Sequence, residues 1–282
     1  MITLLQKIKA ENFLSFHKSE KMLLLPNIWD PIGARILQAK GFPAVATASA
    51  AISASLGFRD GEKIRFTTHL EIIKRIASSV EIPVTADIEG GYASDLSQLK
   101  ENINLLLDTG VVGINLEDSV GKEGILRNIN EQSERISVVR DTADKSGIHL
   151  VINARTDVFL SKENNPEEEL ISEAIKRADA YIKAGGDCFY PVGVLNLEKV
   201  KTLRKEINSP INILGSAKSV PLKTLQDIGI NRVSFGPFIF RSLLKKFSDI
   251  IDEIANLGSY DSFAKNSFSF DEVQKFLKRE NE

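Results

Sequence analysis

Two hydrophobic patterns alternate along most of the chain. From Lys21 onward, short apolar runs rich in Val, Ile and Leu are followed by longer stretches in which apolar residues recur every three or four positions. The short runs predict buried strands and the longer stretches predict amphipathic helices. The predicted strands cover residues 23–27, 44–48, 84–88, 113–117, 149–154, 188–191, 211–214 and 232–235. The predicted helices cover residues 31–40, 67–79, 94–108, 130–146, 166–184, 196–207, 221–228 and 237–255.

The strict alternation of strand and helix predicts an α/β fold with parallel strands joined by right-handed crossovers. Eight such units favour a closed (β/α)8 TIM barrel, because closure leaves no edge strand exposed. A doubly wound open sheet is the rival, but no Gly-x-Gly-x-x-Gly motif follows the first predicted strand. The length of 282 residues suits a single barrel of roughly 250 residues with short extensions.

Two segments lie outside the eight units. Residues 1–20 predict a helix that covers the N-terminal end of the barrel. Residues 258–282 carry the apolar side chains Phe263, Phe268, Phe270, Val273, Phe276 and Leu277. So much aromatic surface predicts a C-terminal helical tail that docks either on its own barrel or on a neighbouring subunit. We therefore divide the chain into a barrel domain, residues 1–257, and a tail, residues 258–282.

Composition and charge exclude several classes of function. The formal net charge of -2 and the pI near 6.1 provide no basic surface for nucleic acid. No apolar run is long enough for a membrane span, and residues 1–9 mix charged with apolar residues, unlike a signal peptide. The single cysteine, Cys188, rules out an internal disulfide and indicates a reducing compartment. We expect a cytoplasmic protein with neither a nucleic-acid nor a membrane partner.

Two acidic residues mark the end of the third predicted strand. Asp87 and Glu89 stand two positions apart and are followed by Gly90 and Gly91. Because side chains at i and i+2 of a strand share a face, both carboxylates are expected to point the same way. Oxygen ligands without His or Cys favour Mg²⁺, or Mn²⁺, over Zn²⁺. For an isolated Asp-x-Glu pair, a solvated acidic strand end is the alternative.

Polar residues also follow the neighbouring strands, at the end of the barrel where catalytic groups are found. The second strand ends in a small-residue turn, residues 47–51, whose hydroxyls and free backbone N–H groups suit an oxyanion. Glu117 and Arg155 follow the fourth and fifth strands. Alone, these two could form a salt bridge between adjacent strand ends. Together with the acidic pair on the third strand, they predict one shared site.

Six motifs resemble those of a known family. They are Leu25-Pro-Asn-Ile-Trp-Asp30, Ser53-Ala-Ser-Leu-Gly-Phe-Arg-Asp60, Ala86-Asp-Ile-Glu-Gly-Gly-Tyr92, Asn115-Leu-Glu-Asp118, Asn153-Ala-Arg-Thr-Asp157 and Arg232-Val-Ser-Phe-Gly-Pro237. In this order, the chain from about residue 13 to residue 242 resembles the isocitrate lyase and phosphoenolpyruvate mutase superfamily. The resemblance implies a barrel that exchanges its eighth helix in a homodimer or homotetramer. It also implies Mg²⁺ and a small 2-oxo or 2-hydroxy carboxylate at the strand ends.

The resemblance assigns roles to individual residues. The implied metal environment, partly through water, is Asp60, Asp87, Glu89 and Glu117. The implied substrate-binding residues are Thr47, Ala48, Ser49, Asn153, Arg155 and Asn212. Arg155 suits a carboxylate because its planar fork of donors matches two oxygens. The catalytic candidates are Lys122, Arg155 and Glu117.

Departures from the family pattern narrow the expected reaction. Isocitrate and methylisocitrate lyases carry a Lys-Lys/Arg-Cys-Gly-His motif in the loop after strand four, with the cysteine as general acid. Here that loop contains neither cysteine nor histidine, so this route is not expected. Those lyases also have a glutamate after the proline of strand six, where this chain has Val192. Phosphonate-handling members use Lys-Thr-Asn-Ser, whereas this chain keeps Lys122 but has Gly124 in place of the asparagine.

The expected function is a Mg²⁺-dependent lyase that cleaves a C–C bond of a small 2-oxo acid through a metal-stabilised enolate, as in oxaloacetate decarboxylation. Loss of CO₂ needs an electron sink but no proton donor, and Lys122 or a metal-bound water would supply any later proton. One alternative is P–C chemistry of the phosphonopyruvate hydrolase or phosphoenolpyruvate mutase type. The other is a protein that binds 2-oxo acids without catalysis, because the loop that supplies acid chemistry is short and degenerate.

Overall fold

The strands of the barrel are short and all parallel. The computed structural model describes residues 2–121, 125–160 and 166–278. The first strand is divided into β1 (Leu23–Leu25) and β2 (Asn27–Ile28) by Pro26, which cannot donate a ladder hydrogen bond. The remaining barrel strands are β3 (Val45–Thr47), β4 (Val84–Asp87), β5 (Gly113–Glu117), β8 (Val151–Thr156), β9 (Cys188–Pro191), β10 (Asn212–Leu214) and β11 (Arg232–Ser234).

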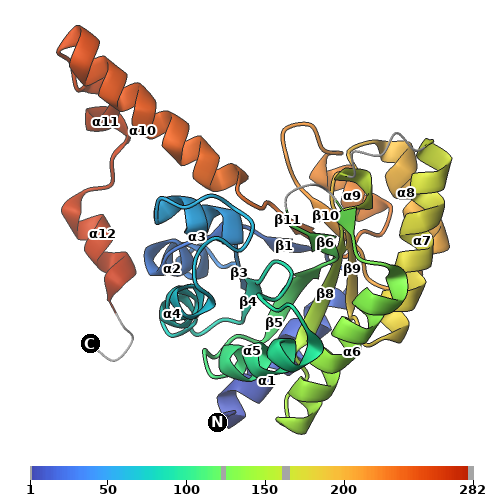
Figure 1. Ribbon diagram of the computed structural model, residues 1–282. Coiled ribbons are helices and arrows are strands. Elements are labelled where there is room, and N and C mark those ends of the chain that lie inside the picture. The colour runs from blue at the N-terminus through green and yellow to red at the C-terminus, as the bar shows by residue number, and fades with distance from the viewer. Residues whose placement is uncertain (1, 122–124, 161–165, 279–282) are drawn as a thin grey trace.

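The strand pairings close the barrel. One sheet has the order β2-β3-β4-β5-β8-β9 and the other has the order β1-β11-β10, with every one of these pairs parallel. The two sheets meet where Phe189 bridges Ile211 and its N–H donates to the carbonyl oxygen of Pro210 at 2.9 Å. Because β1 and β2 are consecutive, the ring is complete (Figure 1). The predicted α/β barrel is confirmed.

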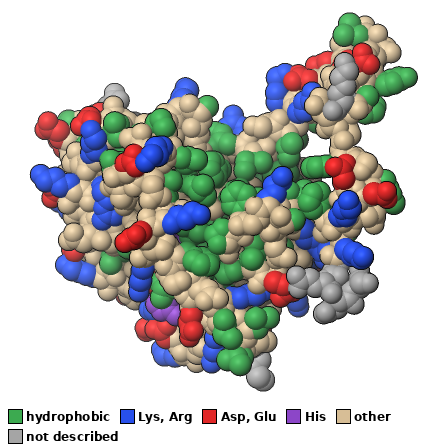
Figure 2. Space-filling model, turned by 180° about the vertical axis from the view of Figure 1, so that it is seen from behind, with side chains coloured by type: hydrophobic (Ala, Val, Ile, Leu, Met, Phe, Trp, Pro, Cys, Tyr) green, Lys and Arg blue, Asp and Glu red, His purple; other side chains and the backbone are tan. Residues whose placement is uncertain are grey.

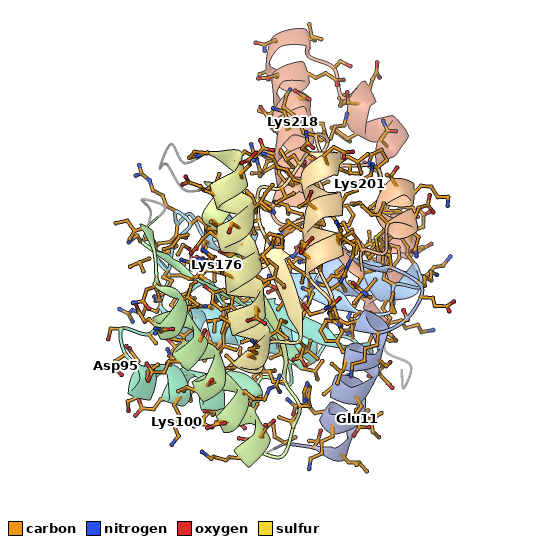
Figure 3. All side chains as sticks on the ribbon, turned by 90° about the vertical axis from the view of Figure 1, so that its right-hand side faces the viewer. Glu11, Asp95, Lys100, Lys176, Lys201 and Lys218 are labelled. Atoms are coloured by element: carbon orange, nitrogen blue, oxygen red, sulfur yellow. The ribbon has the colours of Figure 1, made fainter. Side chains whose placement is uncertain are left out.

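The predicted helices surround this ring. They are α2 (Pro31–Ala39), α4 (Phe66–Ala77), α5 (Leu96–Leu107), α6 (Ile129–Lys145), α7 (Glu167–Lys183), α8 (Leu197–Glu206), α9 (Leu222–Asp227) and α10 (Phe238–Leu257). Figure 3 shows α6, α7 and α8 side by side over the strands, with Lys176 on α7 and Lys201 on α8 at the outer surface. The boundaries differ from the predicted ones by a few residues, as expected where helix ends fray.

Some short elements were not predicted. Residues after β3 form α3 (Ser49–Ser55), the hairpin β6 (Ser119–Val120) and β7 (Ile125–Leu126) follows β5, and a 3₁₀ turn, η1 (Val158–Leu160), follows β8. The segment Ser-Ala-Ala-Ile-Ser-Ala-Ser of α3 has one large apolar residue, so it lacks the amphipathic pattern that indicates a helix. All three elements lie at the C-terminal end of the barrel, where they shape the candidate site.

The N-terminal helix α1 (Leu4–His17) covers the opposite end of the barrel, as predicted. Its Phe13 is fully buried, and a Cβ atom on Gly113 would come within 2.7 Å of the Phe13 ring. Gly113 therefore makes room for the aromatic ring inside the barrel. The amide of Gln6 donates to the carbonyl oxygens of Leu107 and Val111 at 3.0 Å each, which fixes the helix to the strand ends.

The C-terminal segment leaves the barrel. Helix α10 projects outward, and the chain returns through α11 (Asp261–Asn266) to α12 (Phe270–Leu277), which lies beside α2 (Figure 1). Arg35 of α2 donates to the carbonyl oxygen of Phe276 at 3.3 Å, so the tail docks on its own barrel, one of the two predicted alternatives. The apolar residues Leu243, Phe247, Ile251, Ile254 and Leu257 of α10 are exposed. Figure 2 shows further hydrophobic side chains gathered on the barrel face beside this projecting arm. No helix among the described residues combines the length and the apolar character that crossing a membrane requires.

Candidate active site

A cavity of about 640 Å³ opens at the C-terminal ends of the strands. Among its lining residues are Ser49, Asp60, Glu89, Glu117 and Arg155, all of them predicted site residues. They come from β5, β8 and the segments after β3 and β4, which are far apart in the sequence. The barrel topology thus brings them together, as the alternation of strands and helices predicted.

Arg155 and Glu117 form the ion pair that was the structural alternative for these two residues. They are direct neighbours in the parallel pairing of β5 and β8, and Arg155 Nη1 lies 2.6 Å from Glu117 Oε2. Arg155 also donates from Nε and Nη2 to Asp157 at 2.6 and 2.8 Å. This bidentate contact occupies the Nε and Nη2 edge of the guanidinium, and Nη1 pairs with Glu117, so two carboxylates hold the Arg155 side chain in place.

Asp157 was not among the predicted site residues. Its place two positions after Arg155 is the signal that could have indicated it, because residues at i and i+2 of a strand share a face. Burial alone would lower the pKa of Arg155, but the Glu117 and Asp157 carboxylates outweigh it and hold this pKa well above its ordinary value. Arg155 is therefore a permanent cation in an acidic surrounding.

Asp87 is held by the segment that follows β3. Thr47 Oγ1 accepts a hydrogen bond from the Asp87 N–H at 3.0 Å. Ser49 donates to Asp87 Oδ2 from its hydroxyl at 2.7 Å and from its N–H at 3.3 Å. The other carboxylate oxygen, Oδ1, is buried and has no hydrogen-bond partner among the described residues. One oxygen is thus fixed and the other is left for a ligand.

Two of the N–H groups expected to be free in the turn at residues 47–51 have acceptors. Ala48 donates its N–H to the carbonyl oxygen of Ile28 at 3.0 Å, and the Ser49 N–H is used by Asp87. The physical reason is that residues 49–55 form α3 with Ala48 at its N-cap position, instead of an open turn. Substrate binding by Thr47, Ala48 and Ser49 stays a prediction.

Glu89 reaches the cavity from a turn, because β4 ends at Asp87 and the strand alternation does not extend to residue 89. Its φ of 53° is left-handed, as are those of Glu62 at 56° and Tyr92 at 53°. The three residues hold one another. Glu89 accepts from the Glu62 N–H at 2.7 Å and from the Tyr92 hydroxyl at 3.0 Å, and Glu62 accepts from the Tyr92 N–H at 2.8 Å. Such backbone strain, about 1–3 kcal/mol per residue, persists only where contacts of this kind impose it.

The acids of the cavity repel one another. Burial, followed by the charges of Asp87, Asp60 and Glu117, raises the pKa of Glu89 to about 8. Burial raises the pKa of Glu117 to about 7, although the Arg155 cation opposes this shift. Burial and mutual repulsion thus keep part of the cluster protonated around pH 7. Near neutral pH, a bound cation would relieve this repulsion.

The donor set fits a hard divalent cation held mainly through water. Its atoms are carboxylate oxygens, and Asp87 Oδ1 is a buried acceptor without a partner. Within residues 2–121, 125–160 and 166–278, no three acidic, His or Cys side chains converge closely enough to hold a metal directly. Mg²⁺ commonly keeps several waters and takes one or two protein carboxylates, which suits such an open arrangement. The roles of Asp60, Asp87, Glu89 and Glu117 as metal ligands stay predictions.

The remaining predicted residues lie away from the cavity lining. Asn153 is fully buried and donates from Nδ2 to Asn115 Oδ1 at 2.7 Å. Asn212 is also fully buried and donates from Nδ2 to Ser234 Oγ at 3.0 Å. Both therefore belong to a polar layer inside the barrel, below the cavity. Lys122 lies outside the described residues.

Comparison with known proteins bears directly on the resemblance. The family model described as phosphoenolpyruvate phosphomutase matches residues 13–255. The chain belongs to this family. It is 29% identical over 246 residues to the probable 2-methylisocitrate lyase 2 of Corynebacterium glutamicum, with 83% of this chain and 76% of that protein covered.

Solved structures of the phosphoenolpyruvate phosphomutase fold agree with this assignment. A Burkholderia cenocepacia J2315 protein of known structure is 32% identical, with a TM-score of 0.83 and coverage of 88% of this chain and 99% of that one. A phosphonopyruvate hydrolase solved with oxalate and Mg²⁺ shares the fold at 20% identity, with a TM-score of 0.82 and coverage of 95% and 94%. The predicted superfamily is confirmed.

Proposed function

We propose that this protein is a Mg²⁺-dependent lyase that cleaves a C–C bond of a small 2-oxo or 2-hydroxy carboxylate, with decarboxylation of an oxaloacetate-like acid as the leading case. The observation that supports this most is the arrangement of Arg155. Its guanidinium lines the cavity and is held there by Asp157 and Glu117. A guanidinium fixed at the wall of a cavity is a natural partner for a substrate carboxylate.

The acidic residues around Arg155 would hold a metal ion next to the substrate carboxylate. Glu89, Glu117 and the free oxygen of Asp87 would hold Mg²⁺, mostly through its waters. When bound, the ion would stabilise the negative charge that an enolate oxygen acquires as the bond breaks. Arg155 would orient the carboxylate, so that the bond to be broken stays aligned with this electron sink.

A decarboxylation requires few catalytic groups from the protein. CO₂ leaves without a proton donor, so the lack of the family's cysteine and histidine in the loop after β5 is no obstacle. A proton is needed only when the enolate is later converted to the keto acid. Lys122 stays the candidate for that step.

Phosphonopyruvate is the competing substrate. A protein of the same fold, at 20% identity, is a phosphonopyruvate hydrolase, and the same binding of the substrate carboxylate would serve P–C cleavage. The third possibility is a protein that binds 2-oxo acids without turnover. These candidates differ in products, so one assay separates them.

The test presents purified protein with oxaloacetate, phosphonopyruvate or 2-methylisocitrate and follows pyruvate release with Mg²⁺ and with EDTA. We expect EDTA-sensitive pyruvate release from oxaloacetate at a rate above that of free Mg²⁺. Arg155→Met should lower it by at least about 100-fold, because a charge-assisted bidentate contact is lost. Arg75→Met is the matched control, since Arg75 is an exposed residue of α4 that does not line the cavity. Pyruvate from phosphonopyruvate alone, or saturable oxalate binding without any turnover, would replace the lyase assignment with the corresponding alternative.

We also propose that α10 is exchanged between subunits of a homo-oligomer, because its apolar face is uncovered in the single chain. Phe247, which is 63% exposed, lies on this face. Phe247→Asp should therefore shift the protein toward monomer in size-exclusion chromatography with light scattering. Lys246→Asp changes the charge more but leaves the apolar face intact, so it should keep the oligomer. A monomeric wild-type protein would contradict the exchange.

A further inference from the structure

A buried arginine lies at the floor of the barrel, below the candidate site. Arg232 of β11 is 0% exposed, and among the described residues no acidic side chain pairs with it. Its guanidinium lies over the Phe13 ring, 6.0 Å from the ring centre to Cζ. Burial lowers the pKa of Arg232. Burying a cation without a counterion costs free energy, so the other contacts of Arg232 must account for its position.

The first of these contacts is with His17 of α1. His17 Nδ1 lies 2.8 Å from the carbonyl oxygen of Phe13, which can only accept, so Nδ1 carries the proton. Burial and the Arg232 charge lower the pKa of His17 to about 3, so the ring is neutral and Nε2 is an acceptor. Arg232 Nη1, at 3.4 Å, donates to it. The tautomer of His17 is thus fixed from both sides.

The second contact sets the direction of two side-chain amides. Arginine has donors only, so the Asn115 atom that lies 3.3 Å from Arg232 Nη2 must be the oxygen, Oδ1. The same oxygen receives Asn153 Nδ2 at 2.7 Å. Because the nitrogen of the Asn153 amide faces Asn115, its oxygen faces away. Asn153 Oδ1 is buried and lacks a hydrogen-bond partner among the described residues.

The position of these amides relates the chain of hydrogen bonds to the candidate site. Asn115 and Asn153 are direct neighbours in the pairing of β5 and β8, as are Glu117 and Arg155 two residues further along. Since residues at i and i+2 of a strand share a face, the two amides form the layer directly below the ion pair. Neither amide lines the cavity, so the free amide oxygen would accept a hydrogen bond from a ligand O–H group that reaches below the ion pair.

We propose that Arg232 is a positioning residue. Because it can only donate, it fixes the direction of every hydrogen bond from α1 to β8. As a result, Asn153 Oδ1 is presented as an acceptor for an O–H group of the bound ligand or of its hydration shell. That O–H group is either a water of the bound cation or the hydroxyl of a 2-hydroxy acid. Without Arg232, the Asn115 and Asn153 amides could rotate, and Asn153 could present a donor. The binding half of this inference rests on the proposed function, while the amide orientation does not.

The experiment is a double-mutant cycle on ligand affinity. Arg232→Met, Asn153→Leu and the double variant are titrated calorimetrically with oxalate and with glycolate in the presence of Mg²⁺, and their unfolding is followed in parallel. We expect each single variant to weaken binding by about five- to tenfold, the loss of one hydrogen bond in a buried site. The double variant should be no weaker than Asn153→Leu, because Arg232 acts only through Asn153. Arg204→Met is the matched control, since Arg204 donates to Ser209 O and to Asn231 Oδ1, outside this chain of hydrogen bonds.

The outcomes decide the proposal. Weaker binding of both ligands identifies a water as the donor, and weaker binding of glycolate alone identifies the substrate hydroxyl. Additive losses in the double variant would mean that the arginine acts through space by its charge, which overturns the relay. Unchanged affinity with reduced stability would show a structural role only and would overturn it as well. If Arg232→Met does not fold, Asn115→Leu interrupts the same chain one step later.

A second measurement does not depend on ligand. In NMR spectra of the ligand-free protein, the Asn153 side-chain NH₂ protons should be protected from exchange in the wild type and lose that protection in Arg232→Met. Retained protection would overturn the assigned direction even if the protein binds no carboxylate. Absence of oxalate binding with lost protection would instead contradict only the proposed function.

Discussion

Strands β5 and β8 have two faces that are chemically opposite. Their outward side chains include Ile114, Leu116, Ile152 and Ala154, all 0% exposed. Their inward side chains are Asn115, Glu117, Asn153 and Arg155, which are buried or half-buried. The outward face packs against the surrounding helices and needs only shape and apolar area. The inward face needs a hydrogen-bond or charge partner for each group.

This difference separates stability from function within a single strand. Burying one outward Ile or Leu contributes about 1.5–3 kcal/mol from apolar area alone. The inward groups gain little net stability, since each hydrogen bond replaces one to water. Their contribution is to orientation, and the Glu117 and Arg155 pair at the cavity is the clearest example. Changes on the two faces should therefore be distinguishable by different measurements.

The largest expected effect on stability is on the outward face. Ile152→Ala should lower the free energy of unfolding by about 2–5 kcal/mol, because it leaves a cavity in a fully buried position. The urea midpoint should fall accordingly, while the affinity of the folded protein for oxalate and Mg²⁺ stays within about twofold of wild type. Lys145→Ala, an exposed helix position, is the control. A tenfold loss of affinity would show that the two faces are not independent.

A second effect on stability is expected from the inward acids as pH changes. The pKa values of Glu89 and Glu117, about 8 and about 7, exceed the ordinary value of 4.5. Between pH 5 and 8 the folded protein thus binds more protons than the unfolded chain, so the stability of the metal-free protein falls as pH rises. Urea unfolding at several pH values in EDTA measures this slope.

Two variants test whether Glu89 causes this dependence of stability on pH. Glu89→Gln cannot ionise, so it should remove most of the loss of stability between pH 5 and 8. Glu101→Gln, an exposed glutamate of α5, should leave the slope as in wild type. Added Mg²⁺ should restore stability at pH 8 in wild type and less so in Glu89→Gln. A flat profile in the wild-type protein would contradict the mutual repulsion of the cavity acids.

The outward face is what made the fold predictable. The apolar runs of β4, β5, β8 and β9 and the amphipathic stretches between them gave the order and number of barrel units, because burial depends on patterns that the sequence displays directly. The short elements that were not predicted are α3, made of small residues, the hairpin β6 and β7, whose strands are two residues long, and η1, a turn of three residues. None of these elements shows a periodic apolar face in the sequence.

The inward face was predictable in its residues but not in its contacts. Strand-end positions identified Glu89, Glu117 and Arg155 as neighbours. The strand rule failed at Glu89 because three mutually bonded left-handed residues turn the chain there, a long-range arrangement that involves Glu62 from another loop. The direction of the amides above Arg232 was equally hidden, because it depends on which donors and acceptors meet across the barrel.

The smallest expected effect concerns the turn in which Glu62, Glu89 and Tyr92 hydrogen-bond to one another. Tyr92→Phe removes the hydroxyl that donates to Glu89 at 3.0 Å but keeps the ring contacts with Phe66 and His69, at 5.0 and 5.5 Å between centroids. We expect a loss of about 1 kcal/mol in the free energy of unfolding. Because the hydroxyl bonds more strongly to an ionised carboxylate than to a neutral one, the loss should be larger at pH 9 than at pH 6. Tyr260→Phe in the exposed tail is the matched control. An equal loss at both pH values would mean that Glu89 does not change its charge in this range, and the repulsion between the cavity acids would then have to be relieved by another group.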